Sequence, residues 1–478
     1  MKISFLIPPP IDGEKPAERT AGCTHTVYPM PNIYELIVAA VLEQAGHEVY
    51  YHDFVLKNAD KQSFKEFLLK DDSKIYFIWS VNLSIESDRQ AQSLIRLIRP
   101  DALIVFEGPA PTLFLTKFLS DNKTVVIRGE PEMTAMELTD YLQRGEDWTT
   151  IDGISYLKDG LIKTNKSREL IRDLDILPFP ARHLLGDYPF SNPKLKAHPY
   201  TAVLTSRNCP FQCIYCVPSS LTFARELEYK REFSKKPPIS FRSTGNVVKE
   251  LDLLAEQGYQ SIAFIDDNFI VKKERLEIIC ETLKKHRFIW GCQARVDAIT
   301  EDTARILGDS GCEFVDLGVE SFNDAILDYI KKGIHAEDIE KGIALLQKYK
   351  VPVKLNILIG TSPLESIDTL KDTFRRVKKL KVSQVMFNIV APFPGTEFYN
   401  LAKENGWIMG GDYVPTDVQR HSILNYPNLT YKQMERMLFR NNLYFFLRPS
   451  FIWMHIRKFK SFQDFRTAFK ALKIKLFG

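Results

Sequence analysis

The segment "YTAVLTSRNCPFQCIYC", residues 200 to 216, decides the fold of this chain. Its first half is an apolar run that predicts a β-strand over Thr201–Ser206, and its second half places Cys209, Cys213 and Cys216 directly after that strand. Three of the seven cysteines therefore fall within eight residues. Reactive side chains at the carboxyl end of a strand are typical of the site-bearing loops of parallel α/β proteins.

Further strand candidates follow this one, separated by helical patterns, so that the sequence predicts six βα units. Six units indicate an incomplete parallel barrel over residues 199–410, with its chemistry at the carboxyl ends of the strands. The later strands are predicted at Ser261–Ile265, Ile289–Arg295, Phe314–Val319, Val353–Ile359 and Gln384–Val390.

Residues 1–145 show the same alternation of short apolar runs and helical patterns, which predicts an N-terminal Rossmann-like α/β domain. Residues 146–198 are predicted to be a linker with a β-hairpin that turns at Asp159-Gly160. Residues 411–478 are predicted to form a basic, helical C-terminal extension. The strands of the first domain are predicted at Ile3–Ile7, Glu48–Phe54, Ile75–Trp79, Ala102–Phe106 and Thr124–Arg128.

The composition is that of a large protein with several buried cores: the chain has 478 residues, of which 45% are hydrophobic. An odd number of cysteines, seven, argues against a disulfide framework and for reduced thiols. The N-terminal apolar run Ile3–Ile7 is too short for a secretory signal, and no stretch approaches the length of a membrane-spanning helix. These features predict a cytoplasmic protein.

Three kinds of site compete for the clustered cysteines. Buried structural thiols are disfavoured because the spacings of four and three residues fall on one loop. Structural zinc requires four ligands, and no further Cys or His lies nearby in the sequence. Three thiolates suit a four-iron cluster whose last iron binds another ligand. Cys280, Cys292 and Cys312 are expected to be core thiols.

The pattern Cys209-x3-Cys213-x-Tyr215-Cys216 resembles the signature of the radical S-adenosylmethionine (SAM) enzymes, including the aromatic residue before the last cysteine. The resemblance implies a [4Fe-4S] cluster on these cysteines and SAM bound to its open iron. It also implies an external electron donor such as flavodoxin or ferredoxin. One electron then cleaves SAM to a 5′-deoxyadenosyl radical.

Polar residues after two later barrel strands match further motifs of this family. The resemblance implies that Asp266 and Asp267 in "FIDDNF" contact the SAM amino group. It implies that Glu320 and Ser321 in "LGVESFNDAIL" approach the ribose or the methionine end of SAM. One alternative stays open for the two aspartates, which is that they cap the following helix.

Arg295 stands at the end of the third predicted barrel strand, where its guanidinium is expected to hold a SAM carboxylate with two hydrogen bonds. The alternative is an ordinary ion pair with Asp297 or Asp316.

The segment "APFPGTEFY", residues 391 to 399, resembles the subfamily that carries an N-terminal cobalamin-binding domain. That resemblance implies cobalamin at strand ends of the first domain, beside Gly108 in "FEGPAPT" and Gly129 in "VIRGEPE". The domain lacks the Asp-x-His-x-x-Gly pattern that supplies a histidine to cobalt, and Glu107 replaces the first of two glycines common in relatives. A degenerate domain that binds no cobalamin is the alternative.

The C-terminal stretch 436–478 carries ten Lys or Arg residues and one acidic residue, interleaved with aromatic and aliphatic side chains. It predicts peripheral contact with an anionic membrane rather than nucleic-acid binding, and a helical cap on the barrel is the alternative.

The sequence as a whole predicts an enzyme that methylates or rearranges the carbon skeleton of a bulky small-molecule or lipid-like substrate. A radical cyclase or oxidoreductase without cobalamin is one alternative. A non-catalytic iron–sulfur or cobalamin sensor docked on a membrane is the other.

Overall fold

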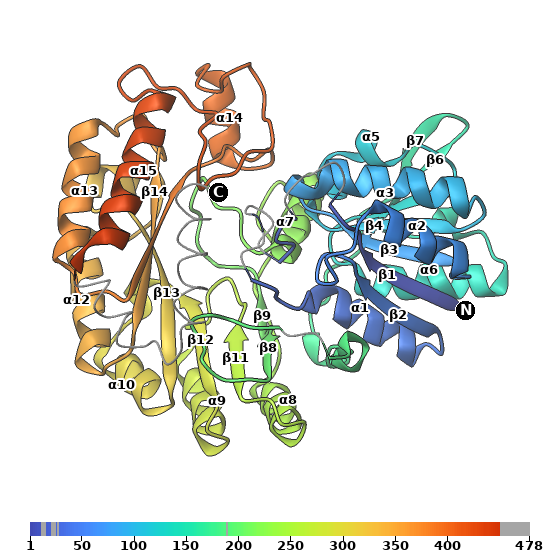
Figure 1. The fold of residues 1–478 in the computed structure, drawn as a ribbon, viewed down its shortest axis with the longest axis horizontal. Coiled ribbons are helices and arrows are strands. Elements are labelled where there is room, and N and C mark those ends of the chain that lie inside the picture. Colours follow the sequence, from blue (N-terminus) through green and yellow to red (C-terminus); the bar gives the residue numbers. More distant parts are fainter. Residues whose placement is uncertain (11–15, 21–24, 26–27, 188–189, 450–478) are drawn as a thin grey trace. The chain divides into compact units, whose positions relative to one another are not determined.

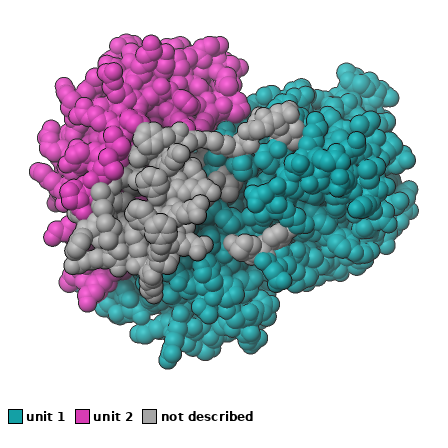
Figure 2. All heavy atoms as spheres, viewed as in Figure 1, with its two compact units in different colours: residues 1–211, 217–294, 301–315 teal, residues 212–216, 295–300, 316–478 magenta. Residues whose placement is uncertain are grey.

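The computed structural model describes residues 1–10, 16–20, 25, 28–187 and 190–449. The chain divides into two compact units, coloured separately in Figure 2. The first unit contains residues 1–211, 217–294 and 301–315, and the second contains residues 212–216, 295–300 and 316–478. The N-terminal sheet and the first half of the barrel therefore belong to one unit.

A seven-stranded sheet forms the N-terminal part of the first unit (Figure 1), in the order β2-β1-β3-β4-β5-β6-β7. Strands β1 to β5 run parallel, as the Rossmann-like prediction requires. One core packs on the sheet face covered by α1 and α6, and a second on the face covered by α2 and α3. The strands are β1 (Lys2–Ile7), β2 (Glu48–Asp53), β3 (Ile75–Trp79), β4 (Leu103–Glu107), β5 (Thr124–Ile127), β6 (Ile154–Lys158) and β7 (Leu161–Thr164).

The predicted hairpin exists, but it is part of the N-terminal sheet rather than a separate linker. Strand β6 pairs antiparallel with β5, and β7 pairs with β6 around Asp159 and Gly160. All four residues of β5 are buried, so its outer edge requires a hydrogen-bonded partner. The sheet consequently extends past the predicted boundary at residue 145.

The six predicted barrel strands are confirmed. They form one sheet in the order β15-β14-β13-β12-β11-β8. Strand β11 runs parallel to β8 and β12, and β14 runs parallel to β15. The strands are β8 (Tyr200–Val203), β11 (Ser261–Phe264), β12 (Ile289–Ala294), β13 (Cys312–Glu320), β14 (Val353–Ile359) and β15 (Gln384–Ile389). A short pair, β9 (Ser206–Arg207) and β10 (Ser240–Phe241), lies beside them in the chain.

The helices follow the amphipathic patterns of the sequence. In the first unit they are α1 (Ile33–Gln44), α2 (Lys61–Lys70), α3 (Ile85–Ile98), α4 (Pro109–Leu113), α5 (Leu115–Phe118), α6 (Glu132–Arg144), α7 (Ser220–Phe233), α8 (Thr244–Glu256), α9 (Lys273–Lys285) and α10 (Glu301–Asp309). In the second unit they are α11 (Asp324–Tyr329), α12 (Ala336–Lys348), α13 (Ile367–Lys379), α14 (Glu397–Glu404) and α15 (Tyr431–Leu447).

Helix α15 contains the start of the basic C-terminal stretch and packs on the second unit. Met434 and Leu438 are buried, and the ring of Phe445 lies 6.3 Å from that of Phe387 on β15. This part of the stretch is a helical cap, while residues 450–478 lie outside the described residues. Among the described helices, none has the length and apolarity needed to cross a bilayer.

Candidate active site

The cysteines divide into two groups by exposure. Cys209, Cys213 and Cys216 are partly exposed. The cysteines predicted to be core thiols, which are Cys280, Cys292 and Cys312, are buried. The partly exposed thiols follow the first barrel strand, Cys209 as part of the first unit and the other two as part of the second. Their exposure suits reactive or metal-binding thiolates better than packing.

The loop of residues 208–216, which carries the three cysteines, is called the cysteine loop. Its middle is held in the second unit by hydrogen bonds between backbone groups. The amide of Ile214 donates to the carbonyl of Ile330 at 3.1 Å, and its carbonyl accepts from the amide of Phe398 at 3.0 Å. The amide of Cys216 donates to the carbonyl of Cys213 at 3.3 Å. These bonds fix the loop conformation without using a cysteine side chain.

Arg295 lies beside the first thiol of this unit. Its Nη1 is 4.0 Å from Sγ of Cys213, and its Nη2 donates to the carbonyl of Lys332 at 2.7 Å. Asp297 accepts from its Nε at 3.0 Å. The ion pair with Asp297 that the sequence left open is therefore present, and the guanidinium also stands next to the cysteine loop.

Lys332 is a buried cation that the sequence did not single out. Only 5% of it is exposed, and its ammonium donates to Oε1 of Glu320 at 2.8 Å and to the hydroxyl of Tyr215 at 3.3 Å. Burial favours a lower pKa, but the charges of Glu320 and Cys213 outweigh it, and the pKa of Lys332 is raised. Lys332 is therefore cationic at neutral pH.

Glu320 ends β13 in an uncommon backbone conformation. Its φ is +67°, in the left-handed region that non-glycine residues seldom adopt, and such strain is common at functional sites. The next residue, Ser321, is buried and its hydroxyl accepts the amide of Asn323 at 3.2 Å. Burial raises the pKa of the nearby Tyr215 phenol well above its ordinary value, and the negative charge of Glu320 adds to the effect.

The first unit holds the residue before Cys209. Asn208 has a φ of +74°, and its amide donates to the hydroxyl of Thr222 on α7 at 3.4 Å. Its side chain bonds to Glu226 at 3.5 Å and accepts from Arg225 on the same helix. The start of the cysteine loop is thus anchored to α7.

Asp266 and Asp267 bond to different segments of the first unit. Asp266 is buried and accepts the amide of Thr205 at 3.2 Å and its hydroxyl at 2.6 Å. Asp267 accepts the amide of Ser219 at 2.7 Å and the hydroxyl of Thr222 at 2.6 Å, so it is bound to the start of α7. Neither aspartate caps the following helix, α9, whose N-terminus has no side-chain cap in the described part of the chain. Contact with SAM stays a prediction for both residues.

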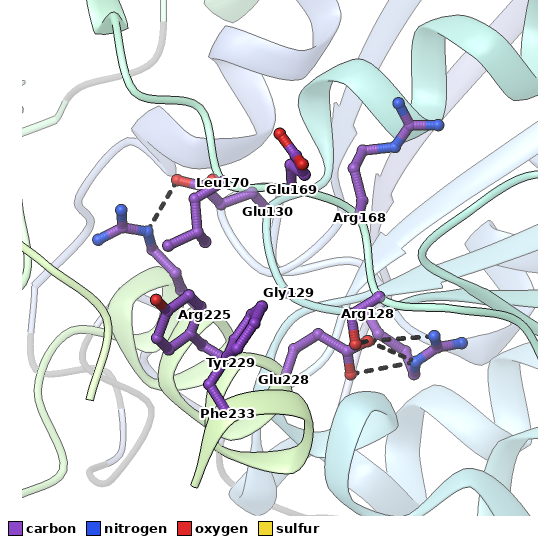
Figure 3. A pocket seen from close by; sticks show the side chains of 11 residues that line it. Arg128, Gly129, Glu130, Arg168, Glu169, Leu170, Arg225, Glu228, Tyr229 and Phe233 are labelled. Carbon is purple, nitrogen blue, oxygen red and sulfur yellow. Dashed lines mark hydrogen bonds and ion pairs between the residues drawn. The ribbon is translucent and has the colours of Figure 1, made fainter. Parts of the chain in front are cut away.

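Helix α7 is docked on the N-terminal sheet by buried charges, as Figure 3 shows. Arg128 after β5 forms an ion pair with Glu228 at 3.1 Å, and Arg225 forms one with Glu130 at 3.0 Å. A small hollow beside these pairs is also lined by Tyr229 of α7.

Arg207, two residues before Cys209, extends this network. It is 1% exposed and pairs with Glu130 at 2.8 Å and with Glu132 at 2.5 Å. Burial alone would lower the pKa of Arg207, but the negative charges of Glu132 and Glu130 have the larger combined effect. The pKa of Arg207 is therefore raised. The cysteine loop and the N-terminal sheet are therefore linked by a network of ion pairs within the first unit.

The two glycines predicted to border cobalamin have positive φ angles of +102° at Gly108 and +75° at Gly129. A Cβ on Gly108 would lie 2.7 Å from the carbonyl oxygen of Ser80, and one on Gly129 would lie 3.1 Å from Cβ of Glu228. Protein atoms thus lie close to both positions, so the packing and the positive φ angles each favour glycine there. Contact of either glycine with cobalamin stays a prediction.

Unsatisfied buried polar atoms gather at the ends of β3 and β4. Both carboxyl oxygens of Glu107 and the Oδ1 of Asn82 are buried without a hydrogen-bond partner. Buried polar groups are rarely left unpaired, so these atoms call for a ligand or water. In this respect the carboxyl edge of the sheet fits a cofactor rich in amide groups.

The donor chemistry of the cysteine loop fits an iron–sulfur cluster, because the loop offers three partly exposed thiols and one of them, Cys213, lies 4.0 Å from Nη1 of Arg295. Among the described residues, no three His, Cys, Asp or Glu side chains are arranged to hold a metal ion. Assignment of the cluster to Cys209, Cys213 and Cys216 therefore stays a prediction.

Comparison with known proteins adds family relations to this geometry. Residues 203–377 match the Radical SAM superfamily. The chain is 27% identical to an uncharacterized methyltransferase of Pyrococcus horikoshii, over 94% of this chain and 93% of that protein. An anaerobic magnesium-protoporphyrin IX monomethyl ester cyclase of Synechocystis is 24% identical over 64% of this chain and 59% of its own length.

One solved structure with a similar fold is a radical S-adenosylmethionine methyltransferase from Kitasatospora setae, determined with cobalamin and a [4Fe-4S] cluster bound. It matches with a TM-score of 0.65 and 16% identity, over 84% of this chain and 74% of that one. At this identity the likeness establishes the fold.

Proposed function

We propose that this chain, as a radical SAM enzyme, uses cobalamin to methylate an unactivated carbon of a bulky small-molecule or lipid-like substrate. Its cluster is assigned to Cys209, Cys213 and Cys216. The observation that carries the proposal is that the only partly exposed cysteines among the described residues are the three that follow the first barrel strand in the chain, and that Arg295 lies 4.0 Å from Sγ of one of them, Cys213. The full-length similarity to a methyltransferase supports the choice of reaction.

The bound cluster and SAM together supply a carbon radical for hydrogen abstraction. Arg295 is held by Asp297 and by the carbonyl of Lys332, so its guanidinium is pre-oriented to bind a carboxylate such as that of SAM. Glu320, which ends β13, and Ser321, which follows it, are assigned to the ribose or the amino acid part of SAM. A one-electron donor such as flavodoxin or ferredoxin completes the reaction partners.

Cobalamin is assigned to the carboxyl edge of β3 and β4, where Asn82 and Glu107 present buried polar atoms without partners. The protein is expected to leave cobalt without a histidine. His52 stacks on Phe67, with 4.5 Å between ring centres, and burial lowers its pKa to about 4, while His47 contacts the N-terminus at 3.3 Å.

A single anaerobic experiment tests the reaction. The full-length protein is reconstituted with iron and sulfide and given SAM and dithionite, and 5′-deoxyadenosine is measured. Its appearance in wild type and its absence in the variant with all three loop cysteines changed to Ala is the expected result. An iron-loaded wild type that forms none contradicts the proposal.

A second measurement tests the cobalamin assignment. Electron paramagnetic resonance of full-length protein with cob(II)alamin should show no nitrogen coupling from a protein histidine. Absence of any cobalamin binding would instead favour radical chemistry without cobalamin, such as the cyclisation named for the Synechocystis relative.

A further inference from the structure

The buried ion pair between Lys332 and Glu320 occupies the space beside a glycine of β13. A Cβ on Gly318 would stand 2.9 Å from Nζ of Lys332 and 2.8 Å from Oε1 of Glu320. Any side chain at this position would displace the ammonium or the carboxylate. Gly318 thus provides the space for a buried ion pair two residues from the end of β13.

The segment that carries Lys332 also contacts the cysteine loop through its backbone. The carbonyl of Ile330 accepts the amide of Ile214, and the carbonyl of Lys332 accepts Nη2 of Arg295, whose Nη1 lies 4.0 Å from Cys213. The side chain of Lys332 adds a third connection, to Tyr215. Residues 330–332 therefore contact the cysteine loop directly at Ile214 and Tyr215, which lie between its last two cysteines. They contact Cys213 only through Arg295.

We propose that Lys332 is a positioning residue that fixes the cysteine loop through Tyr215 and places a buried positive charge beside it, making the iron–sulfur centre easier to reduce. This inference rests on the proposed function, because it takes the loop cysteines as the cluster ligands. It adds to that function a residue that raises the reduction potential of the cluster.

The sign of the effect follows from electrostatics. Reduction adds one negative charge to the cluster, which a nearby cation stabilises and a nearby anion destabilises, and burial limits screening by water and salt. The potentials of iron–sulfur clusters respond to local charge in this way. Glu320 offsets Lys332 in the native pair, so removal of either partner exposes the charge of the other.

Two variants with nearly unchanged shape separate charge from structure. Lys332→Met keeps the length of the side chain and leaves Glu320 uncompensated, so the midpoint potential should become more negative. Glu320→Gln leaves Lys332 unopposed, so the potential should become more positive. A purely structural role would not produce shifts of opposite sign. The measurement is a redox titration of the reconstituted full-length protein, followed by electron paramagnetic resonance without SAM.

The chain offers a matched control in the same unit. Lys354 on β14 pairs with Asp316 on β13 at 2.9 Å, and both are nearly buried. Lys354→Met and Asp316→Asn should leave the potential unchanged, and Lys332→Arg should stay near wild type. If Lys332→Met takes up no iron, the midpoint potential of Glu320→Gln tests the inference alone. A shift to a more positive potential supports the inference, and no shift or a negative one contradicts it.

Two results would overturn the inference. Normal iron content with equal potentials in wild type, Lys332→Met and Glu320→Gln refutes it and leaves the proposed function standing. A wild-type protein that binds no iron at the loop cysteines refutes the proposed function and this inference with it.

Discussion

The indole Nε1 of Trp79, at the end of β3, donates a hydrogen bond to Oγ of Ser220, the first residue of α7, over 3.1 Å. The two residues are 141 positions apart in the chain. Ser220 in turn donates to the carbonyl of Arg19 at 2.7 Å. The helix that begins four residues after Cys216 is thereby fixed to the N-terminal sheet.

Ser220→Ala should destabilise the first unit. The change leaves the buried indole N–H of Trp79 without an acceptor, which costs about 1–3 kcal/mol. Urea unfolding followed by tryptophan fluorescence measures the loss. Ser93→Ala is the control, because Ser93 is exposed on α3 and bonds only within its own helix. Equal stability of the two variants would contradict the role assigned to Ser220.

Arg207→Met should be among the most damaging single substitutions outside the cysteine loop. It leaves the buried carboxylates of Glu130 and Glu132 without their shared partner, and breaking a buried ion pair costs about 3–5 kcal/mol. Arg144→Met removes an ion pair with Asp140 in which both side chains are half exposed, and should cost at most about 1 kcal/mol. Thermal unfolding of the two variants gives the comparison.

Glu107 should make the protein less stable as the pH rises above about 4.5. Burial, with added repulsion from Glu35 and Glu132, raises the pKa of Glu107 well above its ordinary value. The folded state therefore retains a proton that the unfolded state has lost, and stability falls with increasing pH. Burial raises the pKa of Glu35 to about 8, which adds to the same slope.

The variant Glu107→Gln isolates this contribution. It should match wild type near pH 5 and exceed it in apparent melting temperature near pH 8, because the amide never ionises and the carboxyl has no hydrogen-bond partner to lose. Glu256→Gln, on the exposed end of α8, should leave the profile unchanged. A profile of Glu107→Gln parallel to wild type would show that Glu107 does not titrate in this range.

The loop cysteines should account for all bound iron. Changing Cys209, Cys213 and Cys216 to Ala should abolish the absorbance near ~400 nm expected of a cysteine-ligated iron–sulfur centre. Changing Cys280, Cys292 and Cys312, which are buried, should leave it. The assignment fails if the second variant loses iron while the first retains it.

The sequence predicts the barrel well because each strand is a short apolar run followed by a helical pattern, and the six strands were found at the expected places. The sequence does not predict which sheet edge the hairpin of β6 and β7 joins. The alternation of apolar and polar residues specifies which face of a strand is buried, but not which strand it pairs with. The pairing of β6 with β5 therefore differed from the linker expected there.

Among the candidate site residues, too, some can be predicted from the sequence pattern and others depend on how the chain packs. Lys331 and Lys332 are adjacent and identical in kind, yet Lys331 is exposed and pairs with Glu397 while Lys332 is buried against Tyr215 and Glu320. Nothing local to the sequence separates them, because burial of Lys332 depends on a glycine fourteen residues earlier in the chain. The motif cysteines, in contrast, carry their signal in their spacing.

The hairpin at the edge of the N-terminal sheet has a consequence for solubility. Strand β5 is buried along its whole length, whereas β7 is short and mostly exposed, and carries Lys163. Short, charged edge strands resist the edge-to-edge pairing that leads to aggregation. A fragment ending at residue 145 would expose the β5 edge and self-associate, and one ending after Thr164 would keep it covered. The hairpin thus protects the sheet from assembling with copies of itself.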